Sequence, residues 1–255
     1  MDANEAIELL KQIVRLPSFS KEEERVADLL TDVLKKYGFD VHRKGNNVWS
    51  LSKNFDIGKP TVLLDAHIDT VRPNDDWETD PFTPILEDGK LFGLGSNDTG
   101  GSIVSMLAVF VRLSVKVLPC NLIFLGSAEE ENTGRGGIQS VFSELGQVDF
   151  AFVGEPTGMQ PARAEKGLLV LACCAMGKTG HAAREEGVNA IYEAIEDINW
   201  FRSYRFEKGS DLLGPVKMSV TGIEAGGLHN VVPGTCRFMV DIRTNELYTN
   251  QEVYD

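Results

Sequence analysis

Apolar residues recur with the period of a helix in some segments and form runs of strand length in others, and the alternation of these segments predicts a mixed α/β fold. Residues 4–15 place apolar side chains at helical spacing. Ser20 and Glu23 have the spacing of a capping box, so a second helix is expected to start at Ser20 and to end at Gly38.

Further along the chain, apolar runs of strand length alternate with helical patterns. Strands are expected at 40–43, 47–51, 61–66, 121–127 and 149–153, and helices at 101–115 and 136–145. After Lys166 a second unit is expected, with strands at 168–176, 216–223 and 235–243 and a helix at 187–202. This alternation predicts an α/β protein with a largely parallel sheet and two domains, residues 1–166 and residues 167–255.

The final segment, LYTNQEVYD, has the pattern of a helix that has just started, with Thr249 or Asn250 as its cap. A domain rarely ends on the first turn of a helix. We therefore expect the second domain to continue beyond Asp255.

Composition and charge narrow the classes of partner. The chain has 255 residues, of which 42% are hydrophobic, which is enough for a substantial core. The formal charge is −13 and no basic cluster is present, so nucleic acid is not an expected partner. The acidic N-terminal segment lacks the features of a signal peptide, and the longest apolar run, 168–177, is too short for a membrane span. These features predict a cytoplasmic protein without a membrane partner.

Several common motifs are absent or incomplete. The four cysteines (Cys120, Cys173, Cys174 and Cys236) lack zinc-finger spacing, and we expect them to be reduced structural residues. GLGSND at 93–98 resembles a dinucleotide fingerprint but ends in Asp98, where the fingerprint needs glycine. GKT at 177–179 lacks the first glycine of a phosphate loop, and no G-x-S-x-G elbow is present.

Histidine and acidic residues follow the predicted strands at the points where these end. His67 and Asp69 follow the strand at 61–66, Asp98 lies in a glycine-rich turn, the Glu129–Glu131 triplet follows 121–127, and Glu155 follows 149–153. Taken singly, each has a simpler explanation: a core histidine, a solvated loop or a turn residue. Together at one sheet edge they would repel one another unless a cation binds. One imidazole with several carboxylates suits zinc, cobalt or manganese, and Asp69 is placed to orient the ring of His67.

These residues also carry a family resemblance. The segments HIDTV, DPF, GLGSNDTGG, SAEEE and GEPTG resemble, in order and spacing, the M20 metallopeptidase and deacylase family, over essentially the whole chain. Within that family, GEPTGMQPARAEKG is most similar to the acetylornithine deacetylases and succinyl-diaminopimelate desuccinylases. The resemblance implies a zinc-peptidase-like catalytic domain with a mostly parallel sheet and a smaller α+β lid and dimerisation domain.

The resemblance also implies a role for each residue of the predicted site. Two zinc ions, or cobalt ions, would bind to each full-length subunit. His67 and Glu155 would hold the first ion, Asp98 would bridge both, and Glu131 would hold the second. Glu130 would act as the general base, and a slip of one residue within the triplet stays open.

For the second domain, the resemblance implies substrate contacts and a dimer. His181 would stabilise the oxyanion, reaching the active site of the partner in a homodimer. Asn230 and Arg243 would bind the substrate carboxylate. The resemblance further implies a cis peptide bond between Asp98 and Thr99.

Two departures from the family pattern bear on these expectations. Leu94 and the pair Thr99-Gly100 stand where the family has arginine and lysine, which weakens any inference about substrate preference. The family's last zinc ligand is a histidine near the C-terminus, and none of the histidines here lies in that region. We therefore expect that ligand beyond Asp255.

The sequence thus predicts a metal-dependent hydrolase for the amide bond of a small N-acyl amino acid, with N-acetylornithine or N-succinylornithine of arginine biosynthesis as the expected substrate. Succinyl-diaminopimelate desuccinylase and a di- or carboxypeptidase of the same family are the enzymatic alternatives. The alternative from another class is a binding protein that keeps the fold without catalysis.

Overall fold

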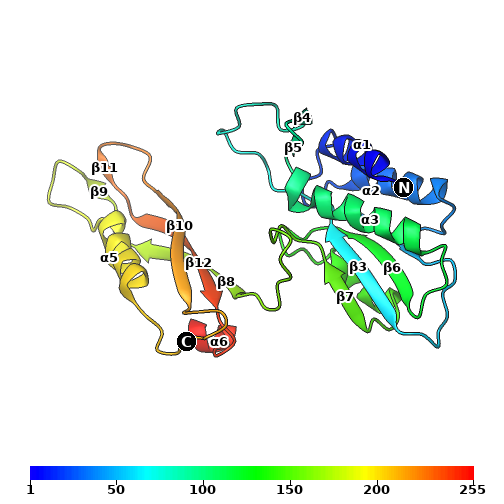
Figure 1. The fold of residues 1–255 in the computed structure, drawn as a ribbon. Helices are drawn as coiled ribbons and strands as arrows, with labels where there is room; N and C mark the ends of the chain where they lie inside the picture. Colours follow the sequence, from blue (N-terminus) through cyan, green and yellow to red (C-terminus); the bar gives the residue numbers. More distant parts are fainter. The chain divides into compact units, whose positions relative to one another are not determined.

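The computed structural model describes residues 1–255 and divides into two compact units, Met1–Met159 and Gln160–Asp255 (Figure 1). Among its helices, none combines the length and the apolar character needed to cross a membrane.

The first unit has a five-stranded sheet in the order β1-β2-β6-β3-β7. Strand β3 runs parallel to both β6 and β7, whereas β2 pairs antiparallel with β6 and with β1. The mixed α/β architecture with a mostly parallel sheet is therefore confirmed. The elements are α1 (Ala3–Val14), α2 (Glu24–Lys36), β1 (His42–Lys44), β2 (Asn47–Leu51), β3 (Thr61–His67), β4 (Ile85–Glu87), β5 (Lys90–Phe92), a π-helical turn (Ser96–Gly100), α3 (Gly101–Leu113), β6 (Asn121–Ser127), α4 (Ile138–Val141), a 3-10 turn (Phe142–Glu144) and β7 (Phe150–Val153).

Both faces of this sheet are covered, which explains why β3 and β6 are almost continuously apolar. Leu64 on β3 and Phe124 on β6 point to a core formed with helices α1, α2 and α3. Their neighbours Leu63 and Ile123 point to the opposite face and pack against Val141 of α4. The parallel strands are thereby fixed in position, and their carboxyl ends form one stable edge.

For the first unit, one local prediction was wrong and one element was not predicted. Helix α2 begins at Glu24, and Glu23 precedes it without a capping hydrogen bond from its side chain. The predicted capping box is absent because the hydroxyl of Ser20 donates to the carboxylate of Asp69 instead. The hairpin formed by β4 and β5 was not anticipated, although its turn, Asp88-Gly89, has positive φ at both residues and is a common hairpin sequence.

The second unit contains a three-stranded antiparallel sheet in the order β10-β12-β8, with α5 packed against one face. Alternate residues of β12, from Cys236 to Ile242, are buried against Ala190 and Ala194 of α5. Of the two caps predicted for the last helix, Thr249 or Asn250, the structure has Thr249, and Glu252 completes a capping box with it. The elements are β8 (Gly167–Met176), β9 (Gly180–His181), α5 (Ala190–Ser203), β10 (Lys217–Ala225), β11 (Val231–Val232), β12 (Thr235–Thr244) and α6 (Asn250–Tyr254).

Candidate metal site

The predicted ligands gather at the carboxyl edge of the parallel strands. His67 is the last residue of β3, and it lies beside Ser127, the last residue of β6. The acidic triplet follows β6 after one further residue, and Glu155 follows β7 after Gly154. Parallel strands direct their carboxyl ends to one edge, so these loops meet in space although they are far apart in the sequence.

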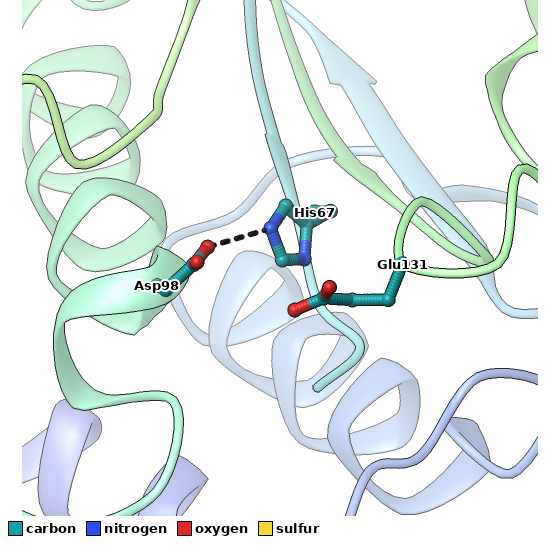
Figure 2. A group of neighbouring side chains, drawn as sticks. All are labelled: His67, Asp98 and Glu131. Carbon is teal, nitrogen blue, oxygen red and sulfur yellow. Dashed lines mark hydrogen bonds and ion pairs between the residues drawn. The ribbon is translucent and has the colours of Figure 1, made fainter. Parts of the chain in front are cut away.

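Three side chains form a compact cluster of possible ligands. His67, Asp98 and Glu131 each offer one donor atom, and these atoms lie within 4.8 Å of one another. Asp98 and Glu131 approach the imidazole of His67 from different segments, as Figure 2 shows, and the Oδ1 atom of Asp98 lies 3.1 Å from Nε2 of His67. Carboxylate oxygens of Glu130 and Glu155 each lie 4.0 Å from the same Nε2 atom. The structure thus brings together His67, Asp98, Glu130, Glu131 and Glu155 at this edge.

The ring of His67 is held in a fixed orientation. Its Nδ1 atom donates to the carbonyl oxygen of Asp69 at 2.9 Å, because a carbonyl can only accept. Nε2 therefore points towards Asp98 and the other carboxylates. When the ring is neutral, this arrangement leaves the lone pair of Nε2 for a metal ion.

The electrostatics of the cluster favour a bound cation. Burial alone would lower the pKa of His67, but the hydrogen bond and charge of Asp69, together with the charges of Glu155 and Glu130, raise it to about 9. Burial and the neighbouring carboxylates raise the pKa of Glu155 to about 7, and burial and the charge of Asp98 raise the pKa of Glu131. In the metal-free chain a proton on Nε2 therefore supplies the positive charge at the position that a metal ion would take.

The turn that carries Asp98 has no room for larger side chains. Gly95 has φ +71°, and a Cβ atom there would lie 2.5 Å from Cγ2 of Thr70. A Cβ atom at Gly100 would lie 2.5 Å from the carbonyl oxygen of Gly95. The Asp98–Thr99 peptide bond is cis, as predicted, and the Thr99 hydroxyl donates to the carbonyl oxygen of His67 at 2.7 Å. The turn is therefore attached directly to the end of β3.

This set of donors fits a divalent metal ion. One imidazole nitrogen and several carboxylate oxygens are the ligands of zinc sites and also suit cobalt and manganese. Asp69, whose side chain is fully buried, accepts hydrogen bonds from Ser20 and from the backbone of Glu130 and Glu131. Burial opposes ionisation of Asp69, but these hydrogen bonds and the one to His67 keep its pKa below the usual value.

The remaining predicted residues lie in the second unit. The backbone N–H of Ala183 donates to Nδ1 of His181 at 3.1 Å, so the neutral ring of His181 carries its proton on Nε2. The loop of Asn230 lies next to it, since the N–H of Ala182 donates to the Asn230 carbonyl oxygen at 3.0 Å. Arg243 is elsewhere on β12 and forms two hydrogen bonds with the carboxylate of Asp241.

Comparisons with known proteins agree with this geometry. The family described as Peptidase family M20/M25/M40 matches residues 63–240. The acetylornithine deacetylase of Proteus mirabilis is 30% identical, over 98% of this chain and 69% of that protein. The succinyl-diaminopimelate desuccinylase of a Wolbachia pipientis strain is 28% identical, over 97% of this chain and 67% of that protein.

A solved structure shows the same fold. The tripeptidase from Staphylococcus aureus superposes with a TM-score of 0.71 at 21% identity, covering 100% of this chain and 69% of that protein. The family match extends from β3 to β12 and therefore includes every residue of the candidate metal site. The chain therefore belongs to peptidase family M20/M25/M40, and it is a metallohydrolase that acts on amide bonds.

Proposed function

We propose that this protein hydrolyses the amide bond of an N-acyl amino acid, and that N-acetylornithine or N-succinylornithine of arginine biosynthesis is its substrate. Two relatives named for the removal of acyl groups from amino acids support this class of substrate. The proposal includes two zinc ions in each full-length subunit, with cobalt as a possible replacement.

The ligands in this proposal are His67, Asp98, Glu131 and Glu155. His67 and Glu155 would hold one ion, Glu131 would hold the other, and Asp98 would be shared by both. Bound zinc supplies Lewis acidity, which polarises an amide carbonyl and lowers the pKa of water.

Glu130 is the general base in this proposal, and its position is the observation that carries it. Its carboxylate lies 4.0 Å from Nε2 of His67 and its side chain is 53% exposed, so it can meet both a water molecule and a substrate. Its backbone is held by Asp69. A carboxylate placed in this way can remove a proton from the attacking water and return it to the leaving amine.

The second unit supplies substrate contacts in the proposal. His181 presents an N–H group at Nε2 and would donate to the oxyanion, in the active site of the partner in a homodimer built through residues 167–255. Asn230 and Arg243 would bind the substrate carboxylate. The guanidinium of Arg243 must then exchange or share its contacts with Asp241.

A matched pair of variants tests the assignment of the acidic triplet. Glu130→Gln is expected to keep its metal and to lose roughly 10²–10⁴ in rate, since only proton transfer is removed. Glu131→Gln is expected to lose metal affinity, measured as metal content after dialysis. If Glu130→Gln loses the metal and Glu131→Gln keeps it, the two roles are displaced by one residue.

Substrate specificity is tested by comparing initial rates with N-acetylornithine, N-succinylornithine, succinyl-diaminopimelate and dipeptides. A clear preference for an N-acylornithine supports the proposal. A preference for dipeptides would favour a peptidase, and no hydrolysis by the metal-loaded protein would favour a binding protein.

A further inference from the structure

Four consecutive backbone N–H groups just beyond the end of β6 are held by side chains from distant parts of the chain. Beyond Ser127 the sheet no longer pairs these groups, so each needs another acceptor. The four hydrogen bonds are Ala128 N to Asn47 Oδ1 at 3.0 Å, Glu129 N to Glu23 Oε1 at 3.1 Å, Glu130 N to Asp69 Oδ1 at 3.1 Å, and Glu131 N to Asp69 Oδ2 at 3.1 Å. The acidic triplet is therefore fixed through its backbone.

Glu23 supplies one of these four acceptors and is not one of the candidate metal ligands. The residue is completely buried, and a buried carboxylate is stable only when its oxygens accept hydrogen bonds. Its Oε1 atom also accepts from the N–H of Lys21 at 2.7 Å, and its Oε2 atom accepts from the side-chain amide of Asn46 at 2.7 Å. All of these partners are N–H donors, and because such bonds weaken steeply when they bend, they fix direction as well as distance.

Capping of α2 does not explain the burial of Glu23. The residue precedes the helix, but its side chain makes no capping hydrogen bond and turns instead towards Glu129. Glu129 has φ +55°, a left-handed conformation that non-glycine residues adopt rarely. The side chain of Glu129 also accepts from the N–H of Gly136 at 3.3 Å. From outside the loop, Glu23 provides the contact to the backbone N–H of Glu129.

We infer that Glu23 is a positioning residue for the acidic triplet. By holding the N–H of Glu129 it fixes the direction in which the next two residues leave the turn. This inference rests on the proposed function for the roles of Glu130 as base and Glu131 as metal ligand. A displacement of about 1 Å at a reacting group can cost about 10² in rate, so a shift of this turn is expected to affect both metal binding and catalysis.

Three variants separate positioning from general stability. Glu23→Met keeps the volume and removes the acceptor for Glu129. Glu23→Gln keeps one acceptor oxygen for the N–H groups of Lys21 and Glu129, while the amide of Asn46 can rotate to accept from the new side chain. Asn46→Ala is the matched control, because it removes a contact to Glu23 and leaves the bond to Glu129 in place.

The measurements are hydrogen exchange of the Glu129 amide in the metal-free protein, the Zn²⁺ dissociation constant by competition with a chromophoric chelator, and kcat and KM for N-acetylornithine. For Glu23→Met we expect faster exchange, Zn²⁺ affinity weaker by about 10–100-fold, and a fall in kcat with KM little changed. Glu23→Gln should restore most of each loss, and Asn46→Ala should stay close to the wild type in all three.

The inference is overturned if exchange at Glu129 does not change in Glu23→Met, or if it becomes faster while Zn²⁺ affinity and kcat stay the same. It is also overturned if Asn46→Ala lowers kcat as much as Glu23→Met does. If Glu23→Met does not fold, the wild type still decides: an amide of Glu129 that exchanges as fast as an exposed loop amide is not held by Glu23. If the wild type does not bind Zn²⁺ or does not hydrolyse substrate, the proposed function is contradicted. The hydrogen-exchange measurement on Glu129 needs neither Zn²⁺ binding nor hydrolysis, so it tests the inference about Glu23 separately.

Discussion

Replacing Asp69 with asparagine is expected to destabilise the metal-free protein by about 2–4 kcal/mol. The fully buried carboxylate accepts from Glu130 N at its Oδ1 atom and from Glu131 N and the Ser20 hydroxyl at its Oδ2 atom. An asparagine can place its single oxygen at only one of these positions. The better choice keeps the bonds to Glu131 and Ser20 and turns the amide NH₂ towards the N–H of Glu130.

The magnitude follows from what this orientation leaves unpaired. One backbone N–H, in a partly buried position, loses its acceptor, which costs about 1–3 kcal/mol. The remaining hydrogen bonds lose the assistance of a negative charge, which weakens bonds of this kind by about half. The loss falls on Glu130, the proposed base, and so the rate should fall together with the stability.

Urea unfolding with a chelator present measures the first effect, with Ser20→Ala as the control that removes a single hydroxyl donor. NMR titration gives a second test, since loss of the negative charge of Asp69 should lower the pKa of His67 from its value of about 9. A loss of stability no greater than that of Ser20→Ala, or an unchanged pKa of His67, would refute the reasoning.

Three further outcomes are expected. The pKa of His67 is about 9 in the folded metal-free chain and about 6.5 in the unfolded chain. The stability that protonated His67 contributes should therefore be complete below pH 6.5 and be lost as the pH rises through 9. The difference in urea midpoint between the wild type and His67→Gln, followed against pH, measures this contribution. Gly95→Ala should lower the melting temperature and the Zn²⁺ affinity, because the new Cβ atom would meet Thr70 at 2.5 Å in a left-handed conformation; unchanged values would contradict this. Asp241→Asn should free Arg243 and change KM more than kcat, and equal effects on both would count against Arg243 as a substrate ligand.

The buried strands were the part of the fold that local sequence could specify. Residues 61–66 and 121–127 are apolar runs bounded by polar or turn residues, and β3 and β6 occupy almost the same ranges. The hairpin of β4 and β5 was missed because its strands are short and largely exposed, although Asp88-Gly89 carried the turn signal.

The error at Ser20 and Glu23 has a different physical cause. Their spacing matches a capping box, which is a contact between close neighbours in the sequence. In the structure Ser20 bonds to Asp69, 49 residues away, and Glu23 bonds to Glu129, 106 residues away. A local pattern carries no information about such distant partners. The grouping of His67 with the acidic residues could be predicted, because parallel strands place their carboxyl ends at one edge of the sheet. That prediction needs no knowledge of any single contact.

The position of the ligands at the ends of three parallel strands links metal binding to strand alignment. His67 and the acidic triplet meet only when β3 and β6 pair as observed, with His67 opposite Ser127. A slip of one residue would move one strand by about 3.3 Å along the other and turn its side chains to the opposite face of the sheet. An ion that binds only the aligned pairing adds about 2.7 kcal/mol to its stability when free metal is at 100 times the dissociation constant. Metal supply would then select the correct alignment during folding, so a variant with weak strand pairing should fold in higher yield when zinc is present from the start.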